Sequence, residues 1–248
     1  MVKARDVQME GVESLAAVRA TGNQFVDALP SPESQEVARF ADLWTFAPGT
    51  RLIAAGGRIE HVYFPVSGAI AQLAERDGGR IEIASVGADG MSGVELALDA
   101  DVASATWTAI VPLTALVLRR RDFLQLCNQS PQAAALARRY AALLMRLIGL
   151  SAACARHDGV EARLARWLLQ LHDHAGAADL VVTHRLAAEM LDAERAAVTR
   201  AYANFVRHGA IRHQRGRLRI VDAAMLSSLA CGCYAQIRAF TDEFYRAR

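Results

Sequence analysis

The sequence predicts an α+β protein with three parts: an N-terminal β jelly-roll (a double-stranded β-helix barrel), a long dimerisation helix and a C-terminal winged helix-turn-helix. Three observations lead to this prediction. Short apolar runs alternate with turn residues over 44–118, apolar side chains follow a heptad spacing over 136–154, and two short helical patterns precede an arginine-rich hairpin over 183–219. The expected boundaries of the three parts are 1–125, 126–157 and 158–248.

Length and composition exclude several classes of protein. The chain has 248 residues, of which 53% are hydrophobic, and a net charge of +2, which suits one large or two ordinary domains. Arg146 interrupts the longest apolar run, near 141–155, so the run is too short for a membrane-spanning helix of about 18 or more uncharged residues. The first 15 residues lack the apolar core of a signal peptide. We therefore expect a cytoplasmic protein with no membrane partner.

A leading helix and a series of short strands make up the expected N-terminal part. Ser34 is a candidate cap for the helix, with Val37, Phe40 and Ala41 on its inner face. Turn residues such as Pro48-Gly49 then separate the runs HVYFPV, AIAQLAE, RIEIASV and TALVLR, which have the length of strands. Regular turn spacing favours an antiparallel sandwich or barrel, and RDGGR between two of the runs predicts a hairpin.

The long helix that follows carries an apolar pattern typical of self-association. Pro131 lies where a first helical turn tolerates proline. The apolar positions are spaced 4-3-4-3-4 and form a narrow heptad seam, whereas Arg138, Arg139 and Arg146 lie on other faces. A helix buried in its own core is the alternative, but the narrow seam favours a homodimer. The predicted interface residues are Leu136, Tyr140, Leu143, Leu147, Leu150 and Cys154.

The C-terminal part contains two short helices joined by a tight turn. Thr183 is a candidate cap for a helix that ends near Leu191. Asp192-Ala193 supplies the turn, and aspartate tolerates the left-handed conformation that such a turn needs. A second helix is expected over 194–208, with Gly209 closing it. Two helices joined in this way form a helix-turn-helix, whose second helix enters the major groove of DNA.

Basic residues are concentrated in this part of the chain. Arg195, Thr199 and Arg200 lie on the side of the second helix away from its apolar stripe, and an arginine side chain can donate two hydrogen bonds to guanine. Between Thr183 and Arg219 there are eight arginines and three acidic residues, a net charge of +5 against +2 for the whole chain. This distribution is typical of a surface that binds double-stranded DNA.

The same residues resemble the CRP/FNR superfamily of bacterial transcription regulators over about 25–235. APGTRLIAAGGRIEHVYFPVSGAI is similar to the start of the family's cyclic-nucleotide-binding-like barrel, and DADVASATWTAIVPLTALVLRRRDFLQL to its end. VTHRLAAEMLDAERAAVTRAYANFVRHGAIRHQRGRLRIVD is similar to the family's winged helix-turn-helix, and LACGCY to the tail of one branch. The resemblance implies a homodimeric regulator that binds a pseudo-palindromic operator, with RNA polymerase as a further partner.

The resemblance also implies roles for individual residues. Arg195 and Arg200 match the base-reading arginines of the recognition helix, and Thr183 and Arg185 match phosphate contacts. Family members often have glutamate after the first arginine, and a carboxylate there accepts from cytosine; this chain has Ala196, which predicts a different operator. The predicted DNA-binding residues are Thr183, Arg185, Arg195, Thr199, Arg200, Arg215 and Arg217.

The barrel departs from the family's nucleotide-binding pattern. Members that bind cyclic nucleotides hold the ribose through a Gly-Glu-Leu segment and the phosphate through an arginine before Ser-Ala. Here Val94 follows Gly93, Glu95 is displaced by one position, and Ala103 replaces the arginine, which removes a charge-assisted contact to the phosphate. We therefore do not expect cAMP binding of this kind, and the effector remains open. The alternatives are a small-molecule pocket built from non-standard residues, and an interaction scaffold without DNA binding.

Neither an enzyme nor a cofactor-binding protein is predicted. Residues 44–118 contain one histidine, His61, too few ligands for a cupin-like metal enzyme, and no GxSxG, P-loop or HExxH motif is present. The cysteines Cys127, Cys154, Cys231 and Cys233 form no CxxC pairs, so we expect reduced, mostly buried thiols with no metal and no cofactor. The alternatives are a haem bound by His61 and a disulfide between two copies of Cys154.

Overall fold

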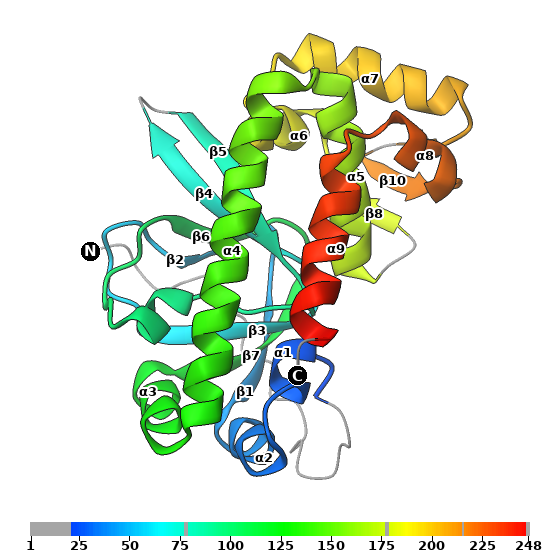
Figure 1. Cartoon of the computed structure of the whole chain (residues 1–248). Helices are drawn as coiled ribbons and strands as arrows, with labels where there is room; N and C mark the ends of the chain where they lie inside the picture. The colour runs from blue at the N-terminus through cyan, green and yellow to red at the C-terminus, as the bar shows by residue number, and fades with distance from the viewer. Residues whose placement is uncertain (1–20, 77–78, 177–178, 215, 247–248) are drawn as a thin grey trace. The chain divides into compact units, whose positions relative to one another are not determined.

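The structure, a computed structural model, describes residues 21–76, 79–176, 179–214 and 216–246 (Figure 1). It confirms the predicted α+β class, with strands concentrated before residue 120 and helices after it. The chain divides into two units, one of residues 1–72 and 86–143 and the other of residues 73–85 and 144–248. Among the described residues, no helix is both long enough and apolar enough to cross a membrane.

The strands before residue 120 form two sheets. Their orders are β1-β7-β3 and β2-β6-β4-β5, and β7 pairs antiparallel with both of its neighbours. The four predicted strand runs correspond to β3, β4, β5 and β7, and the predicted hairpin turn at Asp77-Gly78 lies outside the described residues. The strands are β1 (Asp42–Phe46), β2 (Arg51–Ile53), β3 (His61–Ser67), β4 (Ile70–Arg76), β5 (Gly79–Val86), β6 (Thr106–Ala109) and β7 (Leu113–Arg119), with the short 3-10 helix η1 (Val94–Leu98) between β5 and β6.

Two short helices precede these strands, α1 (Gln24–Asp27) and α2 (Ser31–Phe40). Asn23 caps α1, and its buried amide also donates to the carbonyls of Pro65 and Gly90, at 2.8 and 2.9 Å. The two bonds of the amide anchor the start of α1 to β3 and to the loop that follows β5. The leading helix begins at Ser31, because Pro30 precedes it in an extended conformation, and so a cap at Ser34 was a wrong prediction. Phe40 is 47% exposed rather than turned inward.

Three helices connect the sheets to the C-terminal part: α3 (Arg120–Gln129), α4 (Pro131–His157) and α5 (Val160–Ala175). Ser130 separates the first two, and its hydroxyl accepts from the backbone N–H of Ala133, at 3.2 Å, as a cap for α4. The predicted dimerisation part, 126–157, therefore contains the end of α3 as well as all of α4. In α5 the apolar residues expected to face inward, among them Trp167 and Leu168, are fully buried.

The rest of the second unit is the winged helix-turn-helix. A small sheet of order β8-β10-β9 packs beside the helices, and Val198 and Phe205 lie fully buried in the core. Its elements are β8 (Asp179–Val181), α6 (His184–Met190), α7 (Arg195–Arg207), β9 (Ile211–Gln214), β10 (Arg217–Ile220), α8 (Ala223–Leu229) and α9 (Cys233–Arg246).

A buried carboxylate of β5 also belongs to the second unit. Glu82 is 8% exposed, and its Oε2 accepts a hydrogen bond of 2.9 Å from the indole N–H of Trp167 in α5. Burial raises the pKa of the Glu82 carboxyl to about 7, although the bond from Trp167 and the charge of Arg166 both act to lower it. This hydrogen bond therefore joins the hairpin to the first helix of the DNA-binding part.

Candidate nucleic-acid interface

The helix-turn-helix has the local geometry expected from its sequence. Thr183 caps α6, with its hydroxyl accepting from the backbone N–H of Leu186 at 3.1 Å. Asp192, in the turn between α6 and α7, has a φ of 45°, the left-handed conformation expected there. The carbonyl of Leu191 accepts from Arg163 of α5, at 3.0 Å. These bonds hold the turn, and with it the first residues of α7, in a defined position on α5.

Two arginines lie exposed at the beginning of α7. Arg195 is its first residue and Arg200 lies just over one turn later, and both side chains are exposed. Neither forms an ion pair with an acidic side chain of the described residues. Side chains that lack an internal partner keep their hydrogen-bond donors for another molecule. The orientation of these two arginines away from the core agrees with the sequence-based expectation.

Thr199 has a different environment from the two arginines. Its hydroxyl donates to the carbonyl of Arg195 at 2.9 Å and lies 3.0 Å from Nδ1 of His184. The ring of His184 stacks against Tyr202 and His213, with centroids 4.4 and 4.9 Å apart. Thr199 is thus tied into contacts between α6 and α7. This ring cluster was not predicted, because its members come from three elements and share no sequence pattern.

The His184 ring lies beside the proposed phosphate contacts without adding a charge near neutral pH. Its pKa is lowered, first by burial and then by the neighbouring charges of His213 and Arg195. Since an unperturbed histidine is already mostly neutral at pH 7, the lowered pKa leaves the positive potential of this surface to the arginines.

The wing formed by β9 and β10 contributes further arginines. Arg217, the first residue of β10, is exposed. Arg215, also predicted to contact DNA, lies outside the described residues. Arg219 instead pairs with Asp179 of β8 through two hydrogen bonds of 2.6 and 2.9 Å, which lower the pKa of the Asp179 carboxyl. Arg219 therefore joins β8 to β10 and is not available to DNA in the way that Arg217 is.

Arg185 adds one more exposed cation, on α6. Four residues later on the same helix, Glu189 forms an ion pair with Arg80 of β5. Asn204 of α7 donates to Glu161 of α5, at 2.5 Å. Glu189 and Glu161 are thus engaged with other partners, and Arg185 and the arginines of α7 remain exposed cations of the domain.

Three of the six residues of the heptad seam predicted on α4 are buried within the chain itself. Tyr140 is buried in its own chain, with its ring edge-on to Phe25 at 5.5 Å. Cys154 is buried with its Sγ 3.3 Å from that of Cys231, and Leu143 is 5% exposed. The prediction of a dimer contact was wrong for these three residues because the chain itself covers them. Leu136, Leu147 and Leu150 are half-buried on the same face.

The opposite face of α4 is the exposed one. Met145 is 67% exposed, the largest exposure among the large apolar residues of the described chain. Small residues extend this face along the helix at heptad spacing, and a Cβ added at Gly149 would meet nothing within 4 Å. The exposed apolar or small residues on this face are Ala135, Ala142, Met145, Gly149 and Ala152.

In this chain, the residues at the place where cyclic-nucleotide-binding barrels hold ribose and phosphate differ from the family's pattern. Glu95, in η1, accepts hydrogen bonds from the N–H and the hydroxyl of Ser104, at 3.3 and 3.1 Å. Ala103 is 2% exposed and its backbone bonds to Gly56 and Gly57. The carboxylate is thus present, but an uncharged and buried residue occupies the arginine's place. These residues do not fit a cyclic nucleotide bound through that arginine.

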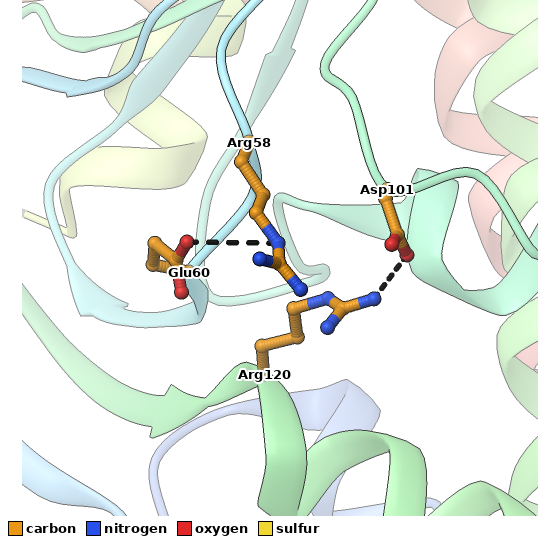
Figure 2. A network of polar contacts seen from close by, with 4 residues as sticks. All are labelled: Arg58, Glu60, Asp101 and Arg120. Atoms are coloured by element: carbon orange, nitrogen blue, oxygen red, sulfur yellow. Dashed lines mark hydrogen bonds and ion pairs between the residues drawn. The ribbon is translucent and has the colours of Figure 1, made fainter.

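Charged residues nearby have structural roles. Arg58 pairs with Glu60 at 3.8 Å, and Arg120 pairs with Asp101. Figure 2 shows the side chains of Arg58 and Arg120 approaching one another between the two carboxylates. Backbone bonds from Arg120 to Glu60 and from Ile59 to Asp101, at 2.8 and 2.9 Å, join the same segments. His61 likewise lies in a ring cluster with Trp44 and Tyr63.

Known protein families match both the N-terminal and the C-terminal half of the chain. Residues 43–130 match the cyclic nucleotide-binding domain family, and residues 162–229 match the Crp-like helix-turn-helix domain family. No curated protein sequence is similar enough to match the chain. The fold is similar to that of FixK2 from Bradyrhizobium japonicum, with a TM-score of 0.65 and 17% identity over 77% of this chain and 98% of FixK2. It is also similar to the CRP-family transcriptional regulator TTHB099 from Thermus thermophilus, with a TM-score of 0.62 and 22% identity over 76% of this chain and 98% of TTHB099. For the c-di-GMP-responsive global regulator CLP from Xanthomonas campestris, the TM-score is 0.60 and the identity 14%, over 77% of this chain and 99% of CLP.

The two matched regions lie on either side of the long helix α4, with the cyclic nucleotide-binding domain before it and the helix-turn-helix domain after it. Together the matched regions take in more than half of the chain. The structure places an exposed pair of arginines on the helix that such a domain presents to DNA. The chain therefore belongs to the CRP/FNR superfamily of DNA-binding transcription regulators.

Proposed function

We propose that the chain acts as a homodimer that binds a pseudo-palindromic operator and regulates transcription in the cytoplasm, with RNA polymerase as a further partner. The observation that carries the proposal is the exposed pair Arg195 and Arg200 on α7, which forms no ion pair with the described acidic residues. In a helix-turn-helix, the N-terminal residues of the second helix contact base edges. Each arginine can donate two hydrogen bonds to guanine O6 and N7.

Phosphate contacts flank this helix in the proposed complex. Thr183 and Arg185 at the start of α6, and Arg217 with Arg215 in the wing, are proposed to bind the DNA backbone. Such contacts set the register of a protein on DNA and carry no sequence information themselves. The hydroxyl of Thr199 is already engaged by Arg195 and His184, so we propose a supporting role for Thr199 rather than a base contact.

The exposed face of α4 is the proposed dimer interface in place of the heptad seam. Glycine inside a helix costs about 0.5–1 kcal/mol relative to alanine, yet within the described chain Gly149 has open space where a Cβ would fit. A second helix backbone that approaches closely in the dimer would account for the glycine. Met145, exposed one turn before it, would then be covered by the partner chain.

Met145→Glu is accordingly expected to convert the dimer into a monomer at micromolar concentration, because a charge would be buried at the centre of the helix pair without a partner. The measurement is light scattering with size-exclusion chromatography. Gln132→Glu is the matched control, since this exposed residue lies in the first turn of α4, where a carboxylate is favourable. A dimer that survives Met145→Glu would show that the interface lies elsewhere.

We further propose that operator binding does not require a cyclic nucleotide bound through an arginine of the barrel. The buried Ala103 and the engagement of Glu95 by Ser104 support this view. The barrel then acts as a scaffold, or as a sensor for a molecule held by other residues.

The experiment that tests the proposed function selects binding sites from random double-stranded DNA. The purified, ligand-free full chain is used at a fixed ionic strength, because such affinities depend steeply on salt. We expect a two-fold symmetric motif whose half-sites lie about one helical turn, roughly 34 Å, apart. Equal enrichment by the wild type and by a variant with both Arg195 and Arg200 changed to alanine would contradict base reading by α7 and favour the scaffold alternative.

A further inference from the structure

Three cysteines and one aspartate from distant parts of the chain meet in the second unit. Cys154 and Asp158 lie one turn apart at the end of α4, and Cys231 and Cys233 lie just before and at the start of α9. One ligand atom from each of the four residues lies within 4.8 Å of every other. This is the one such group of potential metal ligands among the described residues.

The four side chains are held by the surrounding backbone. The N–H of Asp158 donates to the carbonyl of Cys154 at 2.9 Å, and the N–H of Cys231 donates to the carbonyl of Ala162 at 3.2 Å. Leu150 and Ala162 pack against the three sulfur atoms, all of which belong to buried residues. The group is therefore pre-arranged by the end of α4, the start of α5 and the segment before α9.

The separations suit one tetrahedral metal ion. With Zn–S bonds of about 2.3 Å, two thiolates on a tetrahedral ion lie about 3.8 Å apart. The sulfur atoms of Cys154 and Cys231 are 3.3 Å apart, and Sγ of Cys233 lies 4.0 Å from a carboxylate oxygen of Asp158. A four-iron cluster inserts sulfides between its cysteines and needs wider spacing than these four atoms show.

A positive charge lies beside the group. Arg166 of α5 is close enough to Cys154 and Cys231 for its charge to act on both thiols. Arg166 is 7% exposed, and its Nε has no hydrogen-bond partner among the described residues. A buried cation beside the group would partly offset the negative charge of three thiolates and a carboxylate around a divalent ion.

We propose that Cys154, Asp158, Cys231 and Cys233 form a four-coordinate zinc site that joins the C-terminal helix α9 to the junction of α4 and α5. Thiolate ligands favour Zn²⁺ over Mg²⁺ and Ca²⁺. All four positions are filled by the protein, so the site is structural rather than catalytic. Binding forms three Zn–S bonds and one Zn–O bond, and the thiol protons pass to solvent.

The zinc site would add to contacts that α9 already makes with α4. Further along α9, Arg146 of α4 lies 3.9 Å from the ring of Phe240 and 3.2 Å from a carboxylate oxygen of Glu243. Figure 1 shows α9 running beside α5 and the C-terminal half of α4. The zinc would hold the other end of α9, where α4 gives way to α5 and the DNA-binding domain begins.

The test measures metal binding by the purified, reduced full chain. We expect one Zn²⁺ per chain by elemental analysis, and one Co²⁺ per chain, after exchange, with the sulfur-to-cobalt charge-transfer bands of a tetrahedral thiolate site. Removal of a residue that hydrogen-bonds to a metal ligand typically weakens metal binding about 10–100-fold. Since Cys231→Ser and Cys233→Ser each remove a direct ligand, they are expected to weaken Co²⁺ binding by about 100-fold or more. Asp158→Asn should alter the cobalt spectrum while retaining the charge-transfer bands.

The matched control is Cys127→Ser. Cys127 is a half-buried thiol on α3 outside the group, so its replacement should leave both stoichiometry and spectrum unchanged. The cobalt spectrum of the wild-type chain does not depend on whether any variant folds. The proposal is overturned by four titratable thiols with no bound metal, by a Cys154–Cys231 disulfide in the freshly isolated chain, or by several irons and sulfides per chain. Because metal content is measured without DNA, its outcome is independent of the proposed operator binding.

Discussion

Arg195→Ala is expected to weaken binding to the selected operator by about 1–3 kcal/mol and to relax the preference at one base pair in each half-site. Arg195 is exposed at the first position of α7, the end of a recognition helix that contacts base edges. Its replacement removes two hydrogen bonds to guanine and leaves the guanine acceptors without partners. The measurement is a titration of the operator and of single-base variants at constant salt.

The matched control for this prediction is Arg207→Ala. Arg207 is the last residue of the same helix and is also exposed, so each substitution removes one positive charge from the exposed surface of α7. Arg207 lies twelve residues further on, roughly 18 Å away at 1.5 Å per residue. Arg207→Ala should therefore lower affinity similarly for all sequences. If Arg195→Ala also weakens all sequences equally, Arg195 contacts a phosphate and the proposed orientation of α7 is wrong.

Those features that depend on neighbouring residues could be predicted from the sequence. The helix-turn-helix is defined by the Thr183 cap, the apolar spacing of α7 and the turn at Asp192, and all of these signals lie within one short stretch. Strands β3, β4, β5 and β7 were likewise visible as apolar runs between turn residues. Strands β1, β2 and β6 lack such runs; Arg51–Ile53, for example, has only three residues, and its place in the sheet comes from pairing with distant β6.

Features that depend on residues far apart in the sequence could not be predicted in the same way. The periodicity of α4 showed an apolar face but not what covers it, and the contact that buries Tyr140 comes from Phe25. The exposed face around Met145 is built from alanine and glycine, which give little apolar signal. The cysteine group brings together residues 77 positions apart, and the sequence contains no CxxC pairs that would have indicated a metal site.

Glu82→Gln is expected to stabilise the protein on the order of 2 kcal/mol at pH 8 and by much less at pH 5. The buried carboxyl has its pKa raised to about 7, so the folded state holds this proton more tightly than the unfolded state does. The stability that Glu82 contributes is thus fully present below its ordinary pKa near 4.5 and is lost as pH rises to about 7. A rise in pKa from 4.5 to about 7 corresponds to at most roughly 3.4 kcal/mol, at 1.36 kcal/mol per pH unit.

Glutamine removes this dependence while retaining the contact with Trp167. Its side-chain carbonyl can still accept the indole N–H, which lies 2.9 Å from the Glu82 carboxylate, but it carries no charge to be buried above pH 7. The expected gain in the free energy of unfolding is smaller than the free energy of the whole pKa shift, because the added amide N–H group needs a hydrogen-bond partner of its own. Denaturant unfolding of the wild type and the variant at a series of pH values between 5 and 8 measures the effect.

Glu75→Gln provides the comparison, since it removes an exposed carboxylate from the neighbouring strand β4. It should change stability little at either pH. Parallel curves for the wild type and Glu82→Gln over this range would mean that Glu82 is ionised in the folded protein, with the nearby charge of Arg166 outweighing burial. A wild-type curve that falls with rising pH, beside a flatter one for Glu82→Gln, would instead show that the hairpin is joined to α5 through a protonated carboxyl at acidic pH.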